Sequence, residues 1–246
     1  MNTKLKKLWM LPAVVLWMAV AGCGDDGPGG SGTDKNSTDS ESGTDDENGT
    51  GDENGTDSED GTVFVIEARA DDWDNAFPLG YVEAQFHKDD DDYYLIAGSR
   101  FENGAFRLEF SSMVDERFLY PIMGAGAPPW LKVSNPDAKV REVEFFGLNE
   151  KGGYRVAILK YTTFDTHDHD FESGSDGYFL YADSAVTLIG STSEFDAEYG
   201  ITAEYEYNVS LKKGWNVVYQ HIEIEGMTIK LTLSNKNPGG LKWKVK

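Results

Sequence analysis

Two histidines stand two residues apart in the acidic stretch "FDTHDHDFESGSDG". On a β-strand this spacing would place His167 and His169 on one face, where two imidazoles can ligate a Zn²⁺-like ion. Asp165 would share that face. A third ligand would have to come from elsewhere in the chain, and His87 or His221 could supply it only if the fold brings either one close.

The same stretch offers carboxylate oxygens for Ca²⁺ at Asp168, Asp170 and Glu172. It departs from the usual calcium loop, because Ser173 occupies the sixth position, where that loop needs glycine. The alternative to either metal is a polar hairpin loop whose side chains are solvated. We therefore expect no cofactor, with Ca²⁺ or Zn²⁺ as the metals that this loop would take.

Two tryptophans could stack on a sugar ring. Trp73 lies among three aspartates in "ARADDWDNAF", and Trp130 follows two prolines in the bend at 124–136. The alternative is a tryptophan that is buried as a plug beneath its loop. The four aspartates of "KDDDDYY" need no site, because aspartate favours turns and its charge discourages pairing between strand edges.

No local motif for catalysis is present. The sequence lacks a G-x-S-x-G elbow, an H-E-x-x-H helix, a P-loop and a glycine-rich dinucleotide turn. Paired carboxylates for glycoside hydrolysis leave no local trace, and a chain with 43 acidic residues offers many such pairs. We expect a protein that is not an enzyme.

The N-terminus combines three lysines within seven residues and thirteen apolar residues at 8–20. A membrane-spanning helix needs roughly twenty apolar residues, so this run is too short. A basic start, a short apolar run and small residues after it are typical of a secretory signal peptide. We assign residues 1–22 to it.

The run Val20-Ala21-Gly22-Cys23 resembles the lipobox of bacterial lipoproteins. The resemblance implies cleavage before Cys23 and attachment of lipid such as palmitate to its thiol, whose sulfur is readily alkylated. Each buried CH₂ contributes about 0.8 kcal/mol, so several acyl chains hold a protein on a membrane durably. Cys23 is the only cysteine, so the rest of the chain has no disulfide and no thiolate site.

Residues 24–61 contain no aliphatic or aromatic side chain. Such a segment cannot offset its ordering entropy, and the sequence predicts a disordered tether over 23–61. Its 13 acids and one lysine give a charge of −12, which leaves −12 for residues 62–246 out of a total of −21. Nucleic acid and anionic lipid would both be repelled.

The pair Asp25-Asp26 is similar to the signals that send Bacteroidetes lipoproteins to the outer face of the outer membrane. This similarity implies a protein that is lipid-anchored in the outer membrane and exposed at the cell surface. Its partners would then be the membrane, through the anchor, and a glycan or another envelope protein.

From residue 62 onward the dominant pattern has period two, as in a half-buried strand. The clearest case is 201–211, which we expect to continue through 215–222 and 222–233 as an antiparallel meander. Other segments are short, rich in aromatic and β-branched residues, and bounded by turn residues. They lie at 62–68, 79–86, 93–99, 104–110, 117–122, 140–148, 153–161 and 177–182.

About twelve strands in this length indicate an all-β domain at 62–246, built as one large antiparallel β-sandwich or two small packed ones, with an internal seam near 124–136. "ENGAFRLEF", "VSNPDAKV" with "GYFLYADSAVTLIGS", and "YNVSLKKGWNVVY" resemble segments of small Bacteroidetes lipoproteins of unassigned function. The chain is thus expected to be an acyl-anchored envelope lipoprotein with a non-enzymatic binding or structural domain. The alternatives are a glycan-binding accessory protein and a metal-dependent protein.

Overall fold

Alternating side chains define the strands of this protein. In β12 (Ile201–Leu211), Tyr205, Tyr207, Val209 and Leu211 are buried, and the residues between them are exposed. Period-two geometry therefore gives this strand one packed face and one face in water.

The computed structural model describes residues 64–70, 79–89, 92–123, 127–149, 154–164 and 173–246, which all belong to one compact unit. The strands of this part of the chain are β1 (Phe64–Arg69), β2 (Leu79–Asp89), β3 (Asp92–Arg100), β4 (Ala105–Phe110), β5 (Tyr120–Pro121), β6 (Leu131–Val133), β7 (Lys139–Glu142), β8 (Glu144–Asn149), β9 (Arg155–Thr162), β10 (Gly174–Ala182), β11 (Val186–Asp196), β12, β13 (Gly214–Glu225), β14 (Thr228–Ser234) and β15 (Lys242–Val245). One short 3₁₀ helix, η1, covers Glu116–Phe118.

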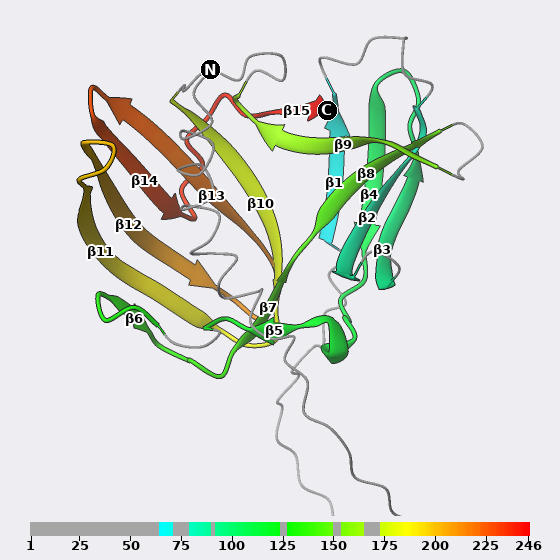
Figure 1. Cartoon of the computed structure of the whole chain (residues 1–246). Helices are drawn as coiled ribbons and strands as arrows, with labels where there is room; N and C mark the ends of the chain where they lie inside the picture. The colour runs from blue at the N-terminus through cyan, green and yellow to red at the C-terminus, as the bar shows by residue number, and fades with distance from the viewer. Residues whose placement is uncertain (1–63, 71–78, 90–91, 124–126, 150–153, 165–172) are drawn as a thin grey trace, which may run out of the picture. The chain divides into compact units, whose positions relative to one another are not determined.

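Thirteen of the described strands form one sheet in the order β3-β2-β8-β9-β10-β13-β14-β12-β11-β6, to which β15, β7 and β5 add at the side. β1 and β4 form a separate antiparallel pair. Figure 1 shows β11, β12, β14 and β13 on one side of the molecule, and β2, β3 and β8 on the other. The expected all-β class with mostly antiparallel sheets packed together is confirmed.

The expected meander through 201–233 is wrong. β14 lies between β12 and β13, parallel to β12 and antiparallel to β13. The turn at Lys212 is held by Asn216, whose side chain accepts from the Lys212 N–H and donates to the Lys212 carbonyl, at 2.9 and 2.8 Å. Beyond this turn β12 and β13 diverge, and β14 fills the space between them. Alternation predicts which way a side chain faces, but it does not predict which strand is the neighbour.

Two of the expected strands are interrupted. In 117–122 only Tyr120–Pro121 is a strand, because η1 occupies Glu116–Phe118 and the Asp115 side chain accepts from the Arg117 N–H at its start. The segment 140–148 is divided at Val143 into β7, which pairs with β10, and β8, which pairs with β2 and β9.

The hydrophobic residues form two clusters on opposite faces of the same central strands. In β10, Phe179 and Tyr181 enter the first cluster, whereas Leu180 and Ala182 enter the second. The first cluster is rich in aromatic rings from both ends of the described chain, and Trp243 of β15 lies in it against Phe106, Phe145, Tyr161 and Phe179. The second cluster is covered in part by residues near the expected seam, including Ile122, Leu131 and Ala138.

Candidate functional site

A polar group projects from the face of β2 that points away from the first cluster. Val82 and Phe86 are buried in that cluster, so alternation turns Glu83, Gln85 and His87 to the opposite face. Gln85 is nevertheless only 1% exposed. A buried amide on the outer face of a sheet requires hydrogen-bonding partners, because an unsatisfied amide costs roughly 1–3 kcal/mol.

Three side chains satisfy Gln85. Its Oε1 accepts from Arg155 Nη2 at 2.6 Å and lies 3.2 Å from His87 Nε2, and its Nε2 donates to Glu83 Oε2 at 2.5 Å. A guanidinium can only donate, so the amide oxygen must face Arg155. The same oxygen then accepts from His87, which means that His87 carries a hydrogen on Nε2.

Arg155 also covers an aromatic ring. Its guanidinium carbon lies 4.1 Å from the centroid of Phe146 and 5.4 Å from that of Tyr93. The ring of His87 packs on the other two, with centroids 5.2 Å from Phe146 and 6.1 Å from Tyr93. Arg155 and His87 together cover Phe146, which is therefore buried although it faces outward from β8 opposite Glu83.

We call this group the outer-face patch and define it as Glu83, Gln85, His87, Tyr93, Phe146 and Arg155. Its rim is apolar and open: Tyr93 is 51% exposed, Leu95 48% and Ile158 45%. The strand register accounts for the grouping, because Tyr93 lies opposite His87, Leu95 opposite Gln85, and Ile158 opposite Phe146.

The patch combines aromatic and polar groups on one surface. It presents an aromatic ring beside a guanidinium and a carboxylate, both of which are hydrogen-bonded to the buried amide of Gln85. Preformed sites of this composition take polar ligands with an apolar face. The six residues include no serine, threonine, cysteine or lysine that could act as a nucleophile.

The metal and lipid residues expected from the sequence lie outside the described residues. These are Cys23 and the loop residues Asp165, His167, Asp168, His169 and Asp170. The two histidines considered as a third metal ligand are described, and they lie apart. His87 belongs to β2, whereas His221 belongs to β13, and three strands (β8, β9 and β10) lie between them in the sheet order. Ser175 Oγ lies 2.9 Å from His221 Nδ1, and in the described part of the chain no group of three His, Cys, Asp or Glu residues could hold a metal ion.

Of the two tryptophans considered for sugar stacking, Trp73 lies outside the described residues. Trp130 is half-buried and packs on the second hydrophobic cluster. Its ring stacks with Tyr205 at a centroid distance of 6.4 Å and lies 5.4 Å from Tyr207. One ring face of Trp130 is therefore used inside the protein.

Sequence reasoning missed the outer-face patch. The segment Glu83-Ala84-Gln85-Phe86-His87 contained the signal, because three polar residues alternate there with apolar ones. The contribution of Arg155 left no local trace, since 70 residues separate it from Gln85.

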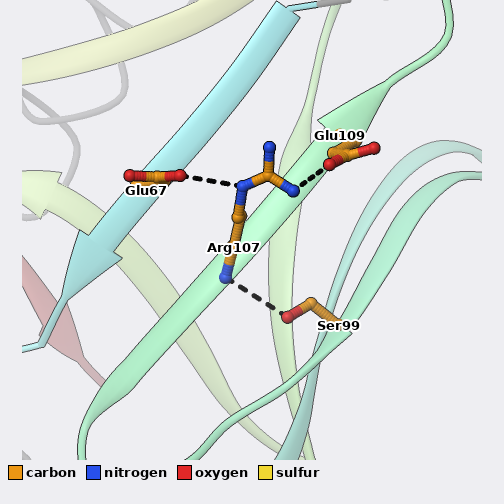
Figure 2. Close-up of polar contacts among 4 residues, drawn as sticks. All are labelled: Glu67, Ser99, Arg107 and Glu109. Atoms are coloured by element: carbon orange, nitrogen blue, oxygen red, sulfur yellow. Dashed lines mark hydrogen bonds and ion pairs between the residues drawn. The ribbon is translucent and has the colours of Figure 1, made fainter.

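A second arginine forms a polar network on the β1–β4 pair (Figure 2). Arg107 Nε donates to Glu67 at 2.8 Å, its Nη1 donates to Glu109, and its backbone N–H donates to Ser99 Oγ at 3.2 Å. All of these side-chain contacts are solvent-exposed. They connect β1, β3 and β4 and contain no buried polar atom, so we assign them to the surface of the fold.

No described helix is long and apolar enough to cross a membrane. No protein-family model, no curated protein and no solved structure matches the chain.

Proposed function

We propose that the protein is an acyl-anchored lipoprotein of the cell envelope, attached through Cys23 to the outer membrane and exposed at the cell surface. The basic start, the short apolar run and the lipobox-like Val20-Ala21-Gly22-Cys23 support the anchor. The acidic, apolar-free segment 24–61 suits a spacer between the membrane and the β domain.

We propose further that the β domain is a non-enzymatic binding module whose ligand is a glycan, bound at the outer-face patch. The observation that carries this proposal is the hydrogen-bonded Gln85, fully covered on an outward face beside the half-exposed ring of Tyr93. A sugar has an apolar face that can stack on Tyr93 and hydroxyl groups that can pair with the accessible guanidinium of Arg155 and carboxylate of Glu83, which the buried Gln85 holds in place.

The test of the ligand is a glycan array carrying neutral and uronic-acid oligosaccharides, probed with the full chain in detergent. Binding should be lost in Tyr93→Ala and retained in Tyr93→Phe, since the ring supplies the contact. The matched control is Phe195→Ala, which removes an exposed ring of β11 far along the sheet from the patch. Binding that survives Tyr93→Ala, or no binding to any oligosaccharide, would contradict the glycan proposal.

The anchor has its own test. Cells grown with an alkyne analogue of palmitate should label the wild-type chain and leave Cys23→Ser unlabelled. Protease added to intact cells should degrade the wild-type β domain. An equally labelled Cys23→Ser protein would contradict the anchor, and a protected domain would contradict surface exposure.

A further inference from the structure

β1 is hydrogen-bonded along one edge within the described residues, where its partner is β4. The Ala70 N–H donates to the Gly104 carbonyl at 2.8 Å. Hydrogen-bonded and non-hydrogen-bonded residue pairs alternate along an antiparallel ladder. Counting back from Ala70 in steps of two, Ala68, Ile66 and Phe64 therefore direct their backbone groups toward β4. The backbone groups of the other three residues, Val65, Glu67 and Arg69, point away from β4.

Two contacts of β4 agree with this assignment. The Ala105 N–H donates to the Glu102 carbonyl at 2.9 Å, and the Arg107 N–H donates to Ser99 Oγ. Both residues lie opposite outward-directed positions of β1, Arg69 and Glu67. Their N–H groups are used elsewhere, as expected for pairs that are not hydrogen-bonded to each other.

A groove of about 430 Å³ runs along this open edge. All six residues of β1 line it, and aromatic rings from other strands form its opposite side: Tyr161, Phe179, Tyr219 and Trp243. Most of these rings belong to or border the first hydrophobic cluster. The groove thus combines a row of backbone donors and acceptors with an aromatic lining.

The far wall of the groove is β15. This strand pairs with β9 on one side, and it meets β1 at a parallel bridge between Ala70 and Trp243. β1 and β15 lie together near the C-terminus in Figure 1. The bridge brings β1 and β15 into direct pairing at Ala70, so an added strand can reach the outward backbone groups of Val65 and Glu67 but not those of Arg69.

We propose that β1 binds an extended peptide strand from a partner protein by β-strand addition in this groove. A polypeptide backbone presents donors and acceptors at the spacing that Val65 and Glu67 require, and recognition by an added strand follows from that match. Alternate side chains of the peptide enter the aromatic lining and are apolar. The charged residues that line the groove are Glu67, Arg69 and Lys242, so a basic residue of the peptide can pair with Glu67. This site is separate from the outer-face patch and does not depend on it.

Amide hydrogen exchange of the full chain in detergent micelles tests the open edge first. The amides of Ile66 and Ala68 should exchange slowly, and those of Val65 and Glu67 should exchange at least about tenfold faster. Uniform protection along β1 would overturn the proposal, because the edge would already be occupied. Concentration-dependent protection that accompanies dimer formation would assign the edge to a second copy and overturn it as well.

The peptide acetyl-Lys-Val-Thr-Val-Thr-Val-Lys-amide is the probe for binding. It should slow exchange at Val65 and Glu67 by about tenfold or more, and the same peptide with N-methyl groups on alternate valines should have no effect. Val65→Pro removes one outward N–H without removing a bond to β4, so it should abolish binding, while Val65→Thr retains it. A cooperative thermal melt of Val65→Pro is required to show that the variant is folded. The N-methylated peptide tests the need for backbone hydrogen bonds on the unaltered protein. Protection by both peptides, or by neither, would overturn the proposal.

Discussion

The two arginine networks of this protein use the same side chain in opposite ways. Arg107 joins Glu67 and Glu109 across an exposed surface, where water already solvates every partner. Arg155 completes the hydrogen bonds of a buried amide, Gln85, and covers the ring of Phe146. The comparison teaches that the number of charged contacts does not predict their contribution to stability. That contribution depends on how far the partner is removed from water.

The largest expected effect concerns Glu142, a third polar group that can be compared with the two arginines. Burial shifts the pKa of its carboxyl group. Burial and, to a lesser extent, the neighbouring Glu144 raise its pKa from 4.5 to about 7. The folded chain therefore binds more protons than the unfolded chain between pH 4.5 and 7, so stability falls as the pH rises through that window and then levels off. The upper limit of this change is about 3 kcal/mol.

Urea unfolding at pH 5 and pH 8 measures the contribution of Glu142. Glu142→Gln should flatten the difference between the two pH values and should be more stable than the wild type at pH 8. Glu225→Gln, which removes the same charge from an exposed strand end, should leave the pH dependence in place. An unchanged pH profile in Glu142→Gln would show that this carboxyl ionises as it does in water.

The substitution Arg155→Ala should have the next largest effect on stability. It removes a donor from Gln85 and the cover from Phe146, and it should lower the free energy of unfolding by about 1.5 kcal/mol. For a domain of this size the melting temperature should fall by about 3–6 °C. Arg155→Lys should recover little of the loss, because an ammonium lacks the planar fork and the stacking surface. Full recovery in Arg155→Lys would mean that charge alone matters.

Arg107→Ala should have a smaller effect, no more than about 0.5–1 kcal/mol, because both ion pairs are exposed. The difference from the wild type should shrink further in 1 M NaCl, which screens exposed charges. Thermal melts at low and high salt measure both quantities. The comparison between the two networks fails if Arg107→Ala is as destabilising as Arg155→Ala.

Metal should have the smallest effect. His221 Nδ1 is already paired with Ser175 Oγ, so we expect EDTA, Ca²⁺ and Zn²⁺ to leave the melting temperature unchanged. A true site at a hundredfold excess over its dissociation constant would add about 2.7 kcal/mol, or roughly 5–10 °C. A rise of that size, abolished by His221→Ala or Asp168→Ala, would restore the metal-site hypothesis.

The fold class followed from the sequence because alternation is a local property. β2, β3, β4, β9 and β12 lie within a few residues of the segments that their patterns predict. β15 gave no comparable signal, since its four residues contain one buried side chain, Trp243. The position of β14 between β12 and β13 depends on how strands pair across the sheet, which alternation does not contain.

The candidate site was less predictable than the fold. A polar face along Glu83, Gln85 and His87 can be read from period two, but three polar residues in a row on one face normally mean solvated surface. What distinguishes this face is Arg155, which reaches Gln85 across two intervening strand pairings, from β9 over β8 to β2. Contacts of this kind become visible only when the strand order is known.

The most direct test of the central claim is calorimetric titration of the best-binding oligosaccharide into three proteins: the wild type, Arg155→Ala and Arg107→Ala. We predict that Arg155→Ala weakens binding at least about tenfold, equivalent to about 1.4 kcal/mol, and that Arg107→Ala binds as the wild type does. Equal affinity in all three proteins would contradict the assignment of the outer-face patch as the binding site.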